Sequence, residues 1–157
     1  ELTDEVGQGL QERGREFGST TGRARRCGWY DAVVVRHAAQ VNGLTSLAVT
    51  KLDVLGGCKE LNICVGYRHG GILYKEMPSD LDALMQCEPV YQRMKGWTAS
   101  TTGATTYKQL PAEAKRYLAR IEELADCRID MISTGSKRTE TIILRNPLKC
   151  SRRRPRS

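Results

Sequence analysis

Apolar side chains recur every three to four residues in two stretches of the chain, the pattern of a helix with one buried face. The first stretch predicts a helix over residues 30–41, and the Asn42-Gly43 pair that follows is a typical helix end. The second stretch predicts a helix over residues 112–125, with Pro111 at its entry. These two segments are the strongest helix predictions in the sequence.

Two weaker helices follow from their capping residues. Residues 3–13 can form a helix that begins at Thr3, although its glycines weaken it. Residues 80–86 can form a short helix that begins at Ser79. Residues 15–28, rich in glycine and hydroxyl side chains, are predicted to be a loop.

Short apolar runs predict the strands. Leu44–Val49 lies between a helix and a polar segment, and it is expected to be a buried strand in parallel pairing. Residues 88–106 are rich in Thr and Gly and are expected to be irregular. The other strands are expected to form two hairpins, residues 61–67 with 72–76 and residues 128–133 with 139–145. Helices alternate with strands and hairpins, so the sequence predicts an α/β fold.

Composition supports one globular unit. The 157 residues are 39% hydrophobic and 27% charged, and no run approaches the ~18 apolar residues of a transmembrane helix. The first residues have neither the basic nor the apolar region of a signal peptide, and no initiator Met is present. We therefore expect no membrane partner, and we expect this chain to be a piece of a longer protein.

The net charge of +7 is concentrated at the carboxyl end. Five of these charges lie in residues 149–157, which leaves +2 for the rest of the chain. A short basic run of this kind is expected to be a disordered, solvated tail, although it could also act as an import signal or contact RNA. No folded nucleic-acid-binding face is predicted, and no nucleic acid is expected as a partner.

The cysteines do not form a metal-binding pattern. The six cysteines include no C-x-x-C pair, and the two histidines, His37 and His69, are too far apart for paired ligands. No metal ligands are therefore predicted in this chain. The same unpatterned cysteines indicate a reducing, cytoplasmic compartment.

The loop after Phe17 has the composition of an anion receptor. Three hydroxyl side chains, an open glycine and three arginines follow one another from Ser19 to Arg26. Hydroxyls and backbone amides can hold a carboxylate or phosphate, and arginines add bidentate contacts. The alternative from composition alone is a flexible solvated loop.

Two polar segments come directly after predicted strands. In Thr50–Asp53, the Asp53 carboxylate could accept hydrogen bonds from N1–H and the 2-amino group of guanine, which adenine does not offer. Lys51 could lie along the base, and Ser133–Ser136 could close over it. Such positions suit a ligand, since open α/β sheets bind ligands at the carboxyl ends of strands. Taken singly, these segments could equally be a polar strand exit and an ordinary turn.

Together, these motifs resemble the adenylosuccinate synthetase family. The string from Glu16 to Trp29 is similar to the family's aspartate-loop signature, and the resemblance continues in order to about Leu148. The matching segments are Asn42–Leu44, Thr50–Leu55, Pro89–Tyr91, Gly96-Trp97, Arg120–Leu124 and Ile132–Gly135. Ser136 differs, because a proline is usual there.

The resemblance implies a GTP-dependent ligase of purine (AMP) biosynthesis that joins IMP and L-aspartate into adenylosuccinate. It implies that this chain, as residues 1–148 followed by the tail 149–157, is the C-terminal portion of a P-loop-NTPase-like, mostly parallel sheet with helices and added β-hairpins. The implied ligands of aspartate and IMP are Ser19, Thr20, Thr21, Gly22, Arg23, Ala24 and Arg25. The implied GTP contacts are Arg25, Lys51, Leu52, Asp53, Ser133, Thr134 and Gly135.

The resemblance also implies parts that this sequence lacks. No G-x-x-x-x-G-K-like phosphate loop is present, and no base for IMP can be assigned. Catalytic residues and the ligands of the Mg²⁺ cofactor are therefore expected outside this chain, in a protein that forms a homodimer. The isolated fragment is expected to be inactive. The alternative is a non-catalytic nucleotide-binding or interaction fragment with a basic tail.

Overall fold

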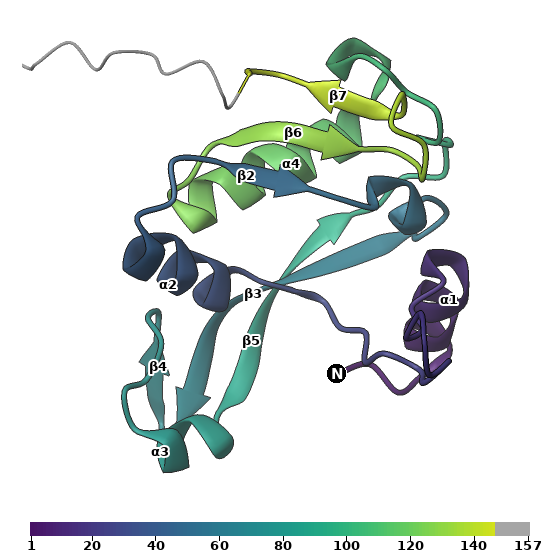
Figure 1. The fold of residues 1–157 in the computed structure, drawn as a ribbon. Helices are drawn as coiled ribbons and strands as arrows, with labels where there is room; N and C mark the ends of the chain where they lie inside the picture. The colour runs from purple at the N-terminus through teal and green to yellow at the C-terminus, as the bar shows by residue number, and fades with distance from the viewer. Residues whose placement is uncertain (147–157) are drawn as a thin grey trace, which may run out of the picture.

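The computed structural model describes residues 1–146 and shows two small sheets with helices beside them (Figure 1). The sequence positions predicted for the basic tail, 149–157, lie outside the described residues. The elements are α1 (Glu5–Gly14), β1 (Tyr30–Asp31), α2 (Ala32–Asn42), β2 (Leu47–Val49), the 3-10 helix η1 (Leu52–Leu55), β3 (Glu60–His69), β4 (Ile72–Tyr74), α3 (Leu81–Met85), β5 (Glu88–Lys95), the 3-10 helix η2 (Tyr107–Gln109), α4 (Ala112–Ala125), β6 (Ile129–Ser133) and β7 (Thr141–Ile143).

The strands form two small mixed sheets. In one, β3 pairs in parallel with β1 and antiparallel with β4 and β5. In the other, β6 pairs in parallel with β2 and antiparallel with β7. The α/β class is confirmed, but within the described residues the expected mostly parallel sheet is not found. Hairpin connections are the reason, since two strands joined by a short turn can pair only antiparallel.

The main core lies between α4 and the sheet of β2, β6 and β7. One face of α4 buries Leu118 and Ile121, and β6 contributes Ile129 and Ile132 from the other side. Each of these four side chains is at most 1% exposed. Burial of one such side chain stabilises the fold by roughly 1.5–3 kcal/mol. The rigid sheet that results holds the carboxyl ends of β2 and β6 side by side.

The two strongest helix predictions are confirmed. Helix α4 covers the predicted residues, and α2 ends as predicted, with Gly43 in the left-handed region at φ 60°. Glycine adopts that conformation without the steric penalty of a Cβ atom. Asp31 caps the start of α2 by accepting hydrogen bonds from the N–H groups of Val33 and Val34.

The two weaker helices begin at different caps from those predicted. Asp4, not Thr3, caps α1 by accepting a 3.0 Å hydrogen bond from the N–H of Gly7. Asp80, not Ser79, caps α3 in the same way. In both cases an aspartate directly follows the predicted cap, and its carboxylate is the stronger acceptor for the free N–H groups of the first turn.

The prediction of an irregular segment at 88–106 is wrong for its first half. Residues 88–95 form β5, which pairs antiparallel with β3 from Glu60↔Lys95 to Arg68↔Glu88. The strand contains Pro89 and Gln92 and buries only one face, so it lacks an apolar run. The sequence of β5 alone does not indicate a strand, and the strand forms because its backbone pairs with β3.

Helix lengths bear on the membrane question. None of the helices within residues 1–146 has both the length and the apolar character needed to cross a membrane.

Candidate functional site

Parallel pairing of β2 and β6 brings two predicted ligand segments together. Val49 at the end of β2 is in register with Ile132 near the end of β6. Both strands therefore deliver the residues that follow them to one edge of the sheet. Two segments about 80 positions apart in the sequence line the same cleft of about 610 Å³. One contributes Lys51 and Asp53, and the other contributes Ser133 and Gly135. The remaining wall comes from the carboxyl end of α1, Thr102 and the turn before β7.

Asp53, which lines this cleft, carries an unsatisfied acceptor. Its Oδ1 atom is buried and has no hydrogen-bond partner within the described part of the chain. A buried carboxylate oxygen without a donor is costly, so such an atom is an expected position for a ligand that brings donors. A cyclic amide beside an exocyclic amine, as in guanine, offers two adjacent donors to one carboxylate.

Lys51 connects the cleft to the end of α1. Its backbone has φ 60°, a left-handed conformation that is unusual for a residue with a side chain. Its ammonium group donates a 2.8 Å hydrogen bond to the carbonyl oxygen of Gly14 and also forms an ion pair with Glu16. The position of the Lys51 side chain is therefore determined by the segment that leads into the arginine-rich loop.

The turn after β6 has little space for side chains. A Cβ atom on Gly135 would lie 2.3 Å from Oε2 of Glu140, so only glycine fits without movement of that carboxylate. Ser133 donates a 2.9 Å hydrogen bond from Oγ to the carbonyl oxygen of Gly135. The turn thus places the Gly135 backbone against the Glu140 carboxylate, and both residues line the cleft.

Two of the predicted ligand residues point into the protein. Leu52 is 1% exposed and Thr134 is fully buried. The Thr134 hydroxyl donates to the carbonyl oxygen of Ala104 at 2.7 Å, and its N–H donates to the carbonyl oxygen of Glu140. Their side chains anchor the two cleft segments and do not reach the cleft.

The predicted anion loop is an exposed hairpin-like turn. Phe17 and Ala24 form an isolated antiparallel bridge, and the N–H of Gly18 donates to the carbonyl oxygen of Arg23 at 2.8 Å. Gly22, at φ 63°, makes the turn possible. In residues 1–146, the side chains of Ser19, Thr20 and Arg23 make no hydrogen bond or ion pair, while Thr21 Oγ1 accepts from the N–H of Arg23. Free hydroxyls and a free guanidinium are thus displayed together.

Glu16 joins the loop to the cleft, and sequence reasoning assigned it no role. One carboxylate oxygen pairs with Arg25 at 3.1 Å, and the other pairs with Lys51. The hydrogen bond from Lys51 lowers the pKa of Glu16, and the contact with Arg25 acts in the same direction. The sequence feature that could have pointed to Glu16 is its position as an acid between a glycine-rich helix end and an arginine-rich loop.

No cluster of His, Cys, Asp or Glu side chains in the described residues has the arrangement needed to hold a metal ion. The described residues therefore supply no set of ligands for Mg²⁺.

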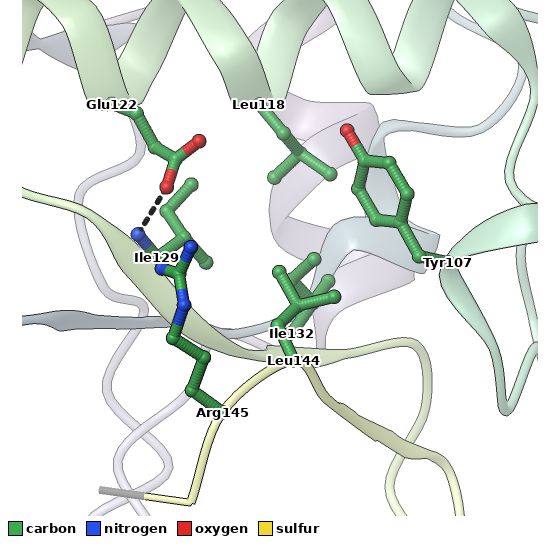
Figure 2. A pocket seen from close by; sticks show the side chains of 7 residues that line it. All are labelled: Tyr107, Leu118, Glu122, Ile129, Ile132, Leu144 and Arg145. Atoms are coloured by element: carbon green, nitrogen blue, oxygen red, sulfur yellow. Dashed lines mark hydrogen bonds between the residues drawn. The ribbon is translucent and has the colours of Figure 1, made fainter. Parts of the chain in front are cut away.

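A second cavity of about 380 Å³ lies between α4 and β6 (Figure 2). Apolar side chains line it together with Glu122 and Arg145, and Glu122 already accepts a 2.6 Å hydrogen bond from the N–H of Ile129. None of the predicted ligand residues lines it. It is a packing feature beside the core and not the site that the motifs predict.

Comparison with known proteins gives a consistent result. The family profile described as adenylosuccinate synthetase matches residues 1–142. An adenylosuccinate synthetase of Pseudomonas putida is 55% identical over 147 residues, which cover 94% of this chain and 34% of that protein. One from Halorhodospira halophila is 54% identical over the same coverage.

A comparison with solved structures agrees with the sequence comparison. The structure described as fully ligated adenylosuccinate synthetase from Plasmodium falciparum superposes with a TM-score of 0.85 at 34% identity, covering 90% of this chain and 34% of that one. The chain thus spans about a third of the length of the curated relatives it matches.

Proposed function

This chain belongs to the adenylosuccinate synthetase family, and we propose that it supplies the guanine-binding cleft and the aspartate loop of a GTP-dependent ligase. The reaction proposed for the whole protein has two steps. N1 of IMP loses its proton to a base outside this chain, the γ-phosphoryl group of GTP passes to the 6-oxygen of IMP, and GDP leaves. The amino group of L-aspartate then attacks C6, and inorganic phosphate leaves to give adenylosuccinate, with loss of the amine proton.

The observation that carries this proposal is the buried, unpartnered Oδ1 of Asp53 in the cleft. Guanine offers N1–H and the 2-amino group as neighbouring donors, and one carboxylate can accept from both. Adenine has an acceptor at N1, which the carboxylate would repel. Asp53 therefore selects GTP over ATP.

The other cleft residues complete the base site. The Lys51 stem lies along the base, and the turn at Ser133 and Gly135, which lines the same cleft, closes over it. Leu52 and Thr134 hold these segments from the interior, because their side chains are buried. Base recognition thus depends on two segments that the sheet brings together.

The exposed loop supplies the anion contacts. Ser19, Thr20 and Thr21 offer hydroxyl groups to the aspartate carboxylates, while Gly22 and Ala24 offer an unobstructed backbone. Arg23, which has no partner within the described residues, contacts IMP and aspartate, and Arg25 contacts GTP. Charge-assisted hydrogen bonds of this kind are about twice as strong as neutral ones.

The rest of the machinery is proposed to lie in other parts of the protein. The phosphate loop, the base that acts on IMP and the ligands of Mg²⁺ belong there, since the described residues offer none of them. When bound, Mg²⁺ would neutralise charge on the transferred phosphoryl group. A homodimer in the cytoplasm is part of the same proposal.

A chimera tests the proposal directly. The matching segment of the Pseudomonas putida relative is replaced by this chain, and adenylosuccinate formation is followed by absorbance with IMP, L-aspartate and Mg²⁺. We expect turnover with GTP and much less with ATP. A folded chimera that shows no turnover, or that uses ATP as well as GTP, would contradict the proposal.

A second function, guanine-nucleotide binding without catalysis, applies to the chain when it is separate from the rest of the protein. The cleft lined by Lys51, Asp53 and Ser133 favours this possibility. Titration of GDP into the separate chain, followed by calorimetry, would measure it.

A further inference from the structure

Three groups meet between the cleft and the loop. Lys51 comes from the segment after β2, Arg25 from the far side of the loop, and Glu16 lies between them. The Glu16 side chain is 22% exposed, less than half as exposed as either cation. Two cations converge on one partly buried carboxylate, so the contact is a network and not a single exposed pair.

The backbone of Glu16 closes the base of the loop. Its carbonyl oxygen accepts a 2.8 Å hydrogen bond from the N–H of Arg25, and its N–H donates to the carbonyl oxygen of Gln11 in α1. Glu16 therefore contacts Arg25, on the far side of the loop, through both its backbone and its side chain.

The connection to the cleft is close-packed. A Cβ atom on Gly14 would lie 3.3 Å from Cγ of Glu16 and 3.5 Å from Cγ1 of Val54 in η1. The Gly14 carbonyl oxygen accepts from the Lys51 ammonium at 2.8 Å. The Lys51 side chain, which extends from a left-handed backbone, is thus held by contacts with the segment that carries Glu16.

We propose that Glu16 is a positioning residue that couples guanine-nucleotide binding to ordering of the aspartate loop, through its simultaneous contacts with Lys51 and Arg25. The inference rests on the proposed function, because it assumes that Lys51 borders the base and that the loop binds aspartate. A base that binds beside Lys51 restricts the position of the ammonium group. The two ion pairs of Glu16 then hold the Glu16 and Arg25 side chains in place. GTP and aspartate then each favour binding of the other, as reciprocal linkage requires.

The chimera described above provides the test. Initial rates are measured over a matrix of GTP and aspartate concentrations at saturating IMP, which yields the interaction factor by which GTP changes aspartate affinity. In the unmodified chimera, we expect GTP to tighten aspartate binding at least threefold. In Glu16→Gln, which keeps the shape but loses the charge, we expect the factor to fall to about 1.

Two further variants separate positioning from general damage. Glu12→Gln removes an exposed acid of α1 with no side-chain contact in residues 1–146, and it should leave the interaction factor unchanged. Glu16→Asp keeps the charge on a shorter stem and should retain part of the coupling, which serves as the second measurement if Glu16→Gln does not fold.

The outcomes distinguish the two proposals. An unmodified chimera without ligase activity would overturn the proposed function and this inference together. An active chimera whose interaction factor is 1, or is the same in Glu16→Gln and the unmodified protein, would overturn the inference alone.

Discussion

The ammonium group of Lys51 donates a 2.8 Å hydrogen bond to the carbonyl oxygen of Gly14, 37 positions earlier in the chain. This contact places the end of α1 against the segment that follows β2. It explains how a residue expected to border the base also touches the approach to the aspartate loop. The cleft and the loop are therefore one structural unit.

Replacement of Lys51 tests its part in the base site. In the chimera, Lys51→Met keeps an apolar stem and removes the ammonium group. We expect the KM for GTP to rise roughly two- to fivefold, because half-exposed charged contacts contribute up to about 1 kcal/mol. Lys75→Met, at an exposed site in the other sheet region, is the matched control. Equal KM values for both variants would argue against a role for Lys51.

Asp53 is expected to determine base choice. Asp53→Asn replaces one acceptor oxygen by a donor that faces the donors of guanine. The KM for GTP should rise by the equivalent of about 2–4 kcal/mol, the cost of unpairing a buried charged contact.

ITP provides the decisive comparison for Asp53. ITP lacks the 2-amino group, so the preference for GTP over ITP should shrink in Asp53→Asn. Asp82→Asn, an exposed change remote from the cleft, should keep the preference. An unchanged ratio of KM values in Asp53→Asn would contradict the assignment.

Arg23 is expected to matter for turnover and not for folding. Arg23→Leu removes an exposed guanidinium, so the free energy of unfolding should change by no more than about 0.5 kcal/mol. The value of kcat/KM for aspartate should fall by roughly 10- to 100-fold, since a charge-assisted contact of about 1.5–3 kcal/mol is lost. Urea unfolding and initial rates measure both quantities. Arg68→Leu is the control, and a comparable loss of activity there would contradict the prediction.

The separate 157-residue chain is expected to form no adenylosuccinate. Nothing in its sequence resembles a phosphate loop, and the described residues hold no metal-binding cluster. The absorbance assay with IMP, L-aspartate, Mg²⁺ and GTP checks this, with the chimera as positive control. Turnover by the purified chain would show that the other two thirds of the relatives' length are dispensable.

Asp31 is expected to be important for stability. Its Oδ1 atom accepts from two N–H groups at the start of α2, and its Oδ2 atom accepts a 2.6 Å hydrogen bond from the hydroxyl of Tyr67. Asp31→Ala should lower the free energy of unfolding by about 2–4 kcal/mol, from the lost cap and the unpaired hydroxyl. Asp80→Ala removes the cap of the exposed helix α3 and should cost about 1 kcal/mol or less. Equal losses in urea unfolding would show that the Tyr67 contact contributes nothing.

Local patterns in the sequence were sufficient for several elements and motifs. The period of α4 and the glycine after α2 predicted those helices, because apolar spacing and a left-handed cap are local properties. The loop from Ser19 to Arg25 and the segment around Asp53 were also visible, since their chemistry lies in consecutive residues.

Tertiary structure decided what depends on distant partners. Strand β5 exists because β3 offers it an edge, and its own residues show no apolar run. Likewise, Leu52 and Thr134 belong to matching motifs, but packing turned their side chains inward. Glu16 gained its role only when folding placed Lys51 and Arg25 on its two oxygens. The contact with Lys51 joins positions 35 residues apart, and the local sequence around Glu16 does not name that partner.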